Sequence, residues 1–263
     1  MSNALLSRRA FLSTGSIASA SLLLGGCGRF DELASDVSRV RQVLAGTNSL
    51  TYRVQRALIG EALAREYGET EIRQGQRPNG STDPQTPEFL ALKKADFAGY
   101  RLRITGLVER PIQLSLDELR NMPARSQVTR HDCVEGWSCI AKWTGVPLAF
   151  LLEQARVKPD GRFVVFHCFD RLGGGLSAPV PYYESCDLRD ARHPQTILAY
   201  GLNGAALPVR NGAPLRARIE RQLGYKMAKY LHTIEVAGSL VGFGAGKGGY
   251  WEDSDGYDWY GGI

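Results

Sequence analysis

Apolar and polar residues alternate along much of the second half of the chain. Alternation over residues 100–106, with arginine and threonine at the polar positions, predicts a half-buried strand. The apolar run over residues 162–168 is typical of a central strand. The same patterns predict further strands over residues 195–202, 215–220 and 230–237.

Helical spacing of apolar residues predicts a helix over residues 30–66. Ser115 and Glu118 form a capping-box pattern that predicts a short helix ending near Pro123. Residues 147–155 are apolar and begin with proline, which favours a helix start. Loop and turn signals fall at residues 75–87, at residues 173–181 and at the hairpin pair Asn203-Gly204.

This mixture predicts one sizeable α+β domain with extensions. The chain is 43% hydrophobic, and its 30 glycines and 12 prolines indicate many turns. The net charge of +5 is mild, and the basic residues are not interleaved with aromatic residues that could stack on bases. Nucleic acid is therefore not an expected partner.

The first 27 residues predict export. The segment Ser7-Arg8-Arg9-Ala10-Phe11-Leu12 is a twin-arginine pattern, followed by an apolar run too short to span a bilayer. This route carries folded proteins, which suits a chain that must receive a cofactor first. Leu24-Gly25-Gly26-Cys27 matches a bacterial lipobox, with Cys27 as the acylated residue. Ordinary peptidase cleavage after small residues is the alternative.

Cys133 lies among charged residues. Arg130, His131 and Asp132 precede it and Glu135 follows. A neighbouring arginine or protonated histidine favours the thiolate, which is the form that binds metal or attacks a substrate. The alternative is a buried thiol or half-cystine. The chain has five cysteines and no CxxC or CxxCH motif, so a zinc site or covalent haem is not expected.

A basic cluster lies between residues 209 and 230. Arg216 and Arg218 project from one face of the predicted strand, close to the turn predicted at Asn211-Gly212-Ala213-Pro214. Guanidinium groups and turn amides together suit a phosphate, whereas a solvated basic face is the alternative.

Several motifs then occur together in a fixed order: Arg130 to Ser138, Trp143 to Leu148, Asn203-Gly204 to Pro208, Asn211 to Arg216, and Gly224-Tyr225-Lys226 to Lys229. In these motifs the chain resembles the sulfite-oxidase-type molybdenum enzymes over roughly residues 75–240. Within them it is most similar to the exported bacterial branch that includes the catalytic subunit of periplasmic protein-methionine-sulfoxide reductase. The resemblance implies a mixed, strand-rich α+β fold around one molybdopterin.

The resemblance also implies roles for individual residues. Cys133 corresponds to the cysteine that ligates molybdenum, and a soft thiolate suits that metal. Arg130, His131 and Glu135 would surround this ligand, while Tyr225 or His167 could supply a proton. The positions implied to hold the molybdopterin are Cys168 (in place of a threonine), Asn211, Arg216, Met227, Ala228 and Lys229, with Arg216 and Lys229 suited to its phosphate.

These inferences predict four segments: an export signal at 1–27, a helical extension at 28–74, a molybdopterin-binding catalytic domain at 75–240 and an aromatic, acidic tail at 241–263. The five aromatic residues of the tail predict that it folds back onto the domain. Too few residues follow the core for the dimerisation domain of animal and plant sulfite oxidases, so a monomer is expected.

The expected activity is oxygen-atom or electron transfer at molybdenum in the periplasm. The candidate substrates are methionine sulfoxide in proteins, small S-oxides or N-oxides, and sulfite. The electrons would come from a membrane haem subunit or a cytochrome. The alternatives are a non-enzymatic exported lipoprotein with an anion or a protein as its ligand, and thiol-disulfide chemistry between Cys133 and Cys139.

Overall fold

The computed structural model describes residues 39–173 and 178–263. The export and lipid-attachment predictions for residues 1–27 lie outside this range. The chain divides into two compact units at Leu58, and helix α3 (Arg39–Ile59) ends at this boundary. The predicted helix over residues 30–66 is wrong beyond Ile59. Gly60 adopts a left-handed backbone conformation, and Glu66 instead forms a β-bridge with Thr129.

The second unit contains two five-stranded sheets. The first sheet has β1 parallel to β10 and all other neighbours antiparallel. Its strands, in the order β2-β1-β10-β5-β6, are β1 (Arg101–Gly106), β2 (Ile112–Ser115), β5 (Phe163–Leu172), β6 (Val180–Asp187) and β10 (Leu231–Ala237). The strands predicted over residues 100–106, 162–168 and 230–237 are therefore confirmed, whereas β2 and β6 were not predicted.

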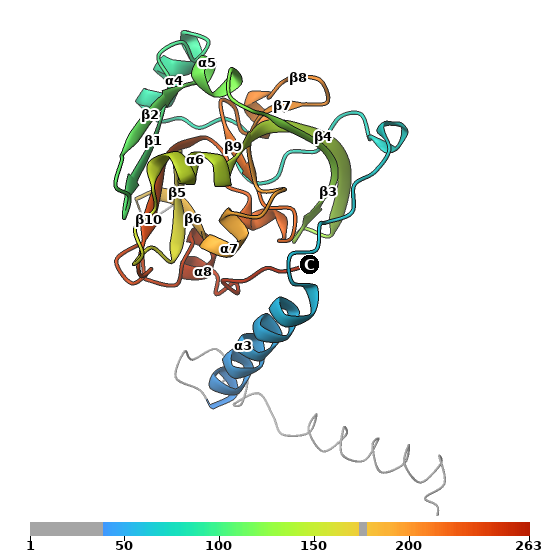
Figure 1. Ribbon diagram of the computed structural model, residues 1–263, viewed down its shortest axis with the longest axis vertical. Coiled ribbons are helices and arrows are strands. Elements are labelled where there is room, and N and C mark those ends of the chain that lie inside the picture. The colour runs from blue at the N-terminus through green and yellow to red at the C-terminus, as the bar shows by residue number, and fades with distance from the viewer. Residues whose placement is uncertain (1–38, 174–177) are drawn as a thin grey trace, which may run out of the picture. The chain divides into compact units, whose positions relative to one another are not determined.

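The second sheet is antiparallel throughout and lies on the other side of the same unit (Figure 1). β7 pairs with β4 along one edge and with both β8 and β9 along the other. Its strands are β3 (Arg125–Cys133), β4 (Trp137–Pro147), β7 (Ile197–Leu202), β8 (Ala205–Ala206) and β9 (Arg216–Arg218). The predicted strands over 195–202 and 215–220 are confirmed, as is the hairpin turn at Asn203-Gly204 between β7 and β8.

The hydrophobic core fills the space between the sheets. Leu102 and Ile104 of β1, Ile234 of β10, and Ala141 and Trp143 of β4 all belong to one buried cluster. On β1 the alternating arginines face outward, as the sequence pattern predicts. Burying this apolar surface provides the main driving force for packing the sheets together.

Short helices and turns connect the strands. Ser115 and Glu118 form the predicted capping box at the start of α5, and Pro147 precedes α6. The elements are α4 (Pro87–Lys94), α5 (Leu116–Arg120), α6 (Leu148–Ala155), α7 (Leu188–Ala191), α8 (Tyr250–Ser254) and the 3₁₀ turns Glu69–Glu71, Val209–Asn211 and Gly224–Lys226. Among the described residues, no helix is both long and apolar enough to cross a bilayer.

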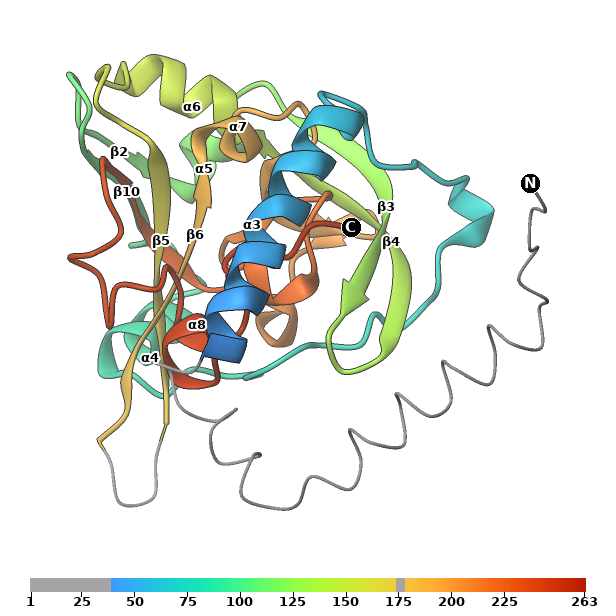
Figure 2. The same cartoon turned by 90° about the horizontal axis from the view of Figure 1, so that it is seen from below.

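The C-terminal tail folds back onto the sheets, as its aromatic content predicts. Trp259 packs edge-on against Phe163 of β5, with ring centroids 5.6 Å apart. Gly262 forms a bridge with Gln222. Figure 2 shows the same unit from below, with α8 beside the long β5–β6 pair. The tail is therefore part of the folded unit that carries the candidate site.

Candidate functional site

The β3–β4 hairpin places Cys133 at the edge of a cavity. Cys133 is the last residue of β3 and pairs with Trp137, and Gly136 turns the chain with a φ of 81°. The thiol is half-buried, and burial raises its pKa, which the Glu135 backbone amide and the charge of Arg77 offset only in part. The thiol pKa is therefore raised rather than lowered, contrary to the expectation from the sequence. Deprotonation would instead accompany metal binding.

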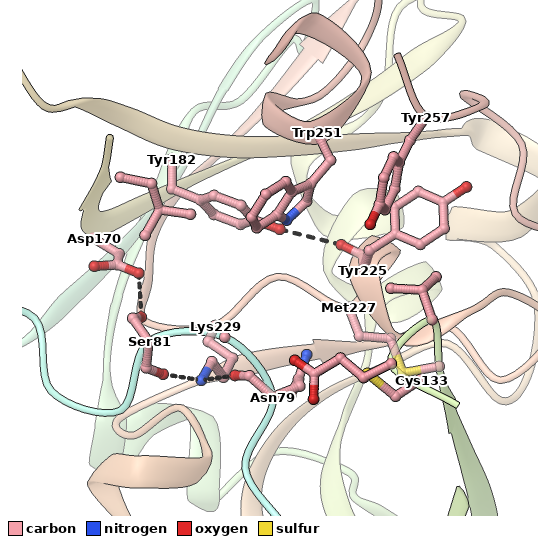
Figure 3. A pocket seen from close by; sticks show the side chains of 14 residues that line it. Asn79, Ser81, Cys133, Asp170, Tyr182, Tyr225, Met227, Lys229, Trp251 and Tyr257 are labelled. Carbon is pink, nitrogen blue, oxygen red and sulfur yellow. Dashed lines mark hydrogen bonds between the residues drawn. The ribbon is translucent and has the colours of Figure 1, made fainter. Parts of the chain in front are cut away.

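Fourteen residues from several distant segments line this cavity (Figure 3). The thiol and Met227 lie on one side, and a row of aromatic rings faces them across the space. The complete lining is Asn79, Gly80, Ser81, Cys133, Val134, Glu135, Asp170, Leu172, Tyr182, Tyr225, Met227, Lys229, Trp251 and Tyr257. The loop that precedes α4, predicted to be irregular, supplies the first three of these.

Lys229 is the cation of this lining. Its ammonium donates to the carbonyl oxygens of Asn79 (2.5 Å) and Ser81. Burial and the nearby Arg216 lower the pKa of Lys229 to about 7. No carboxylate among the described residues lies within ion-pair distance of Lys229 or Arg216. An anion bound beside them would raise the pKa of Lys229 and so favour its charged form.

Arg216 lies fully buried behind this position. Its guanidinium donates to the carbonyl oxygens of Asn211 (2.9 Å) and Met227 (3.3 Å), and lies 4.9 Å from the ring centroid of Trp143. Its Nε has no hydrogen-bond partner in the described part of the chain. A buried guanidinium N–H without a hydrogen-bond partner lowers the stability of the fold. Nε is therefore suited to donate to an acceptor atom of a bound ligand.

His131 is buried and neutral rather than a charged neighbour of the thiol. Arg218 donates to its Nδ1 at 2.7 Å, so the imidazole proton must lie on Nε2. Burial lowers the pKa of His131 well below its usual range, and Arg218, Arg216 and Lys229 add to the effect. Nε2 has no partner within the described chain. His131 thus presents one unused N–H donor beside Gly224.

The other predicted site residues separate into those that face the cavity and those that do not. Glu135 and Tyr225 line it, as do Met227 and Lys229. Glu135 accepts from the indole N–H of Trp137 at 2.9 Å. The Tyr225 hydroxyl donates to the carbonyl of Asp258 at 2.6 Å, and burial raises its pKa. Tyr225 therefore has its proton committed to a backbone acceptor.

Three predicted residues lie elsewhere. Arg130 points away from the cavity and pairs with Asp132 at 2.9 Å on the exposed face, because residues three apart on a strand face opposite sides. Cys168 is buried in the hydrophobic core and is not among the cavity-lining residues. His167 contacts Glu235 at 3.0 Å, also outside this cavity. Arg130 and Cys168 therefore do not line this cavity, and their roles toward the ligand and the cofactor stay predictions.

Asn211 and Ala228 do not line the cavity, and they support it through hydrogen bonds to neighbouring segments. Asn211 donates to the Gln76 carbonyl at 3.4 Å, and the Ala228 carbonyl accepts from Ala217. Cys139 pairs with His131 in the β3–β4 ladder, and both Cys133 and Cys139 are free. Cys139 is thus the buried thiol that its sequence context favours.

Four residues of the site were not predicted from the sequence: Asp170, Tyr182, Trp251 and Tyr257. Asp170 and Tyr182 come from β5 and β6 at the cavity, and the two other residues belong to the tail. The five aromatic residues of the tail could have indicated the last two, because aromatic side chains that fold back onto a domain must cover part of its surface.

The comparisons with known proteins identify the family of the domain. Residues 89–239 match the model of the oxidoreductase molybdopterin-binding domain. The chain belongs to this family. The predicted mixed α+β molybdopterin-binding fold is therefore confirmed, and molybdopterin is the cofactor of the domain.

Curated relatives carry reductase names. The chain is 42% identical over 171 residues to YedZ1 of Azospira oryzae, which has the provisional name protein-methionine-sulfoxide reductase subunit. It is 37% identical over 145 residues to the protein-methionine-sulfoxide reductase catalytic subunit MsrP of Gluconobacter oxydans, and 37% identical over 141 residues to that of Ralstonia nicotianae. These matches cover 65%, 52% and 51% of this chain. The chain spans 59%, 46% and 43% of the respective relatives.

A more distant likeness exists to the crystal structure of the sulfane dehydrogenase SoxCD from Paracoccus pantotrophus. Its TM-score is 0.49 at 22% identity, and the match covers 60% of this chain and 41% of that chain. A likeness at this level says nothing about activity.

The residues present fit a molybdopterin. Cys133 offers a soft ligand atom at the cavity, Lys229 adds a lining cation, and the Arg216 Nε and the His131 Nε2–H are unused donors. No group of three or more His, Cys, Asp or Glu side chains among the described residues could hold a metal ion. A metal at this cavity would therefore depend on Cys133 together with ligands from the pterin.

Proposed function

We propose that the protein is a molybdopterin-dependent reductase of uncharged S-oxides such as methionine sulfoxide. The observation that carries this proposal is the charge of the cavity around Cys133. Its lining holds one cation, Lys229, which the cofactor phosphate would engage, and two acids, Glu135 and Asp170. No arginine lines the cavity in the described part of the chain. An anionic substrate such as sulfite would meet the negative charge of Glu135 there without an arginine to bind it, whereas a neutral S-oxide would not be repelled.

The reaction converts a sulfoxide, two electrons and two protons into a thioether and water. The cofactor, when bound, supplies the metal at which the oxygen atom is transferred and the two electrons pass. Cys133 would hold that metal, and Arg216 and Lys229 would hold the phosphate. Asp170 accepts a hydrogen bond from Ser81, and burial raises the pKa of its carboxyl. It is the lining carboxyl best suited to hold a proton for the substrate oxygen.

The electrons would come from outside the chain, through a membrane haem subunit or a cytochrome. The names of the relatives support a reductase. The twin-arginine pattern supports a periplasmic location, with the protein either lipid-anchored through Cys27 or cleaved after small residues. The protein would act as a monomer. Replacement of both Arg8 and Arg9 by lysine should keep the protein in the cytoplasm, measured by cell fractionation.

Metal analysis and a substrate panel test the proposed function together. The purified exported protein should contain about one molybdenum per chain, and Cys133→Ser should lose it. Cys139→Ser is the matched control and should keep the metal, because its thiol does not line the cavity. In the panel, methionine sulfoxide and dimethyl sulfoxide should be reduced, and sulfite should not be oxidised. A metal-free protein, or oxidation of sulfite as the fastest reaction, would contradict the proposal.

A further inference from the structure

The tail forms one wall of the cavity. Trp251 and Tyr257 stack with ring centroids 5.9 Å apart and an interplanar angle of 26°. Tyr257 packs edge-on against Tyr225 at 5.1 Å. In Figure 3 the rings of Tyr182, Trp251 and Tyr257 form a row that faces Cys133 and Met227 across the cavity. We call Trp251 and Tyr257 the tail wall.

The tail wall is fixed by the two residues that follow Trp251, one in a buried ion pair and one in several hydrogen bonds. The next residue, Glu252, accepts from the fully buried ammonium of Lys226, which also donates to Glu184 of β6 at 2.7 Å. Asp253 accepts from the Tyr183 hydroxyl at 2.6 Å and from two backbone amides of the preceding loop. Such contacts hold α8 in one position, so Trp251 is pre-organised before a substrate arrives.

The wall extends to the surface. Tyr257 is 37% exposed and Val134, which follows Cys133, is 44% exposed, and both line the cavity. The exposed part of the lining thus combines these apolar and aromatic side chains with the Glu135 carboxylate, whereas Lys229 and Asp170 are buried. Aromatic rings offer large apolar contact area at little entropic cost, and they make favourable contacts with sulfur.

We propose that Trp251 and Tyr257 determine specificity by packing against the hydrocarbon arm of an uncharged thioether S-oxide, such as a methionine sulfoxide side chain within a peptide. This inference rests on the proposed function and adds the residues that recognise the substituent on sulfur. Dimethyl sulfoxide, which carries only methyl groups, would contact the tail wall less. Selectivity between the two substrates therefore reports on the wall.

The test compares kcat/KM for N-acetyl-methionine sulfoxide methylamide with kcat/KM for dimethyl sulfoxide in the purified holoenzyme. In Trp251→Ala the ratio of the two values should fall about tenfold, mainly through a higher KM for the peptide analogue. Trp251→Phe should restore most of the ratio. Tyr257→Ala should lower the ratio about threefold. Because Tyr257 is more exposed than Trp251, this second variant keeps the test valid if Trp251→Ala misfolds.

Trp259→Phe is the matched control. Trp259 belongs to the same tail but donates to Ser185 at 2.9 Å and does not line the cavity, so the ratio should stay at the wild-type value. Binding of the corresponding sulfone, which serves as a non-reacting analogue, is measured by calorimetry and should weaken about tenfold in Trp251→Ala.

The outcomes separate the two proposals. A holoenzyme that reduces neither S-oxide contradicts the proposed function, while sulfone binding still tests the wall. Equal losses for both substrates, or sulfone binding unchanged in Trp251→Ala and Tyr257→Ala, would overturn the tail-wall proposal. A molybdenum content that falls in Trp251→Ala would also overturn it, because the wall would then belong to the cofactor.

Discussion

Replacing Lys226 with methionine would remove the cation from a fully buried cluster with two carboxylates. The exposed fractions of Lys226, Glu184 and Glu252 are 0%, 0% and 1%. At a separation of about 3 Å and an effective dielectric constant of about 20, each ion pair is worth roughly 5 kcal/mol. The several kcal/mol needed to desolvate the ammonium offset part of this attraction. We expect Lys226→Met to lower the free energy of unfolding by about 3–5 kcal/mol at pH 7.5.

The loss of unfolding free energy in Lys226→Met should depend on pH. Burial raises the pKa of Glu184, and the attraction of Lys226 is the largest influence that opposes this rise. Without Lys226 the pKa must rise further. A carboxyl with a raised folded-state pKa stabilises the fold below its unfolded pKa, and this stability is lost as pH rises through the folded pKa. The deficit of Lys226→Met should therefore shrink between pH 7.5 and pH 5.

Guanidinium denaturation at both pH values measures the effect. Glu252→Gln is the matched control, because it leaves a neutral Lys226–Glu184 pair, and it should cost less than about 1.5 kcal/mol. The reasoning would be refuted if the Lys226→Met deficit were the same at both pH values, or no larger than that of Glu252→Gln.

Two further predictions concern Lys229 of the cavity lining and Gly224 beside His131. The first is tested in protein prepared without cofactor. Because the pKa of Lys229 is lowered in the folded state, the folded state binds the lysine proton more weakly than the unfolded state. The free energy of unfolding should therefore rise from pH 7 towards pH 10. Lys229→Met should lack this rise in chemical denaturation, and an identical profile would contradict the assignment. A Cβ on Gly224 would lie 2.5 Å from His131 Nε2, so Gly224→Ala should lower the free energy of unfolding by about 1–3 kcal/mol. Gly68→Ala, whose Cβ meets only ordinary contacts, should change it by less than about 1 kcal/mol in the same assay, and equal losses would argue against this packing.

Local patterns predicted the elements whose signals are local. The capping box at Ser115 and Glu118 forms as expected because both partners lie within one helical turn. The alternation before Gly106 predicted β1 because one face of that strand is buried and the other is exposed. The strands β3 and β4 gave no such signal, because charged and aromatic residues of the site interrupt their alternation. Without β3, the sequence could not show that Arg130 faces away from Cys133.

The sequence by itself determined the family, the thiol that suits a soft metal, and the basic residues that suit a phosphate. The tertiary structure decided what surrounds them. Lys229 meets the carbonyl of Asn79 across 150 positions in the chain, and Trp251 reaches the same cavity from the tail. Such neighbours depend on how the two sheets and the returning tail pack, and no local pattern encodes distances between segments so far apart. The same packing buries Cys168 in the core and leaves His131 neutral, because burial acts only once the chain has folded.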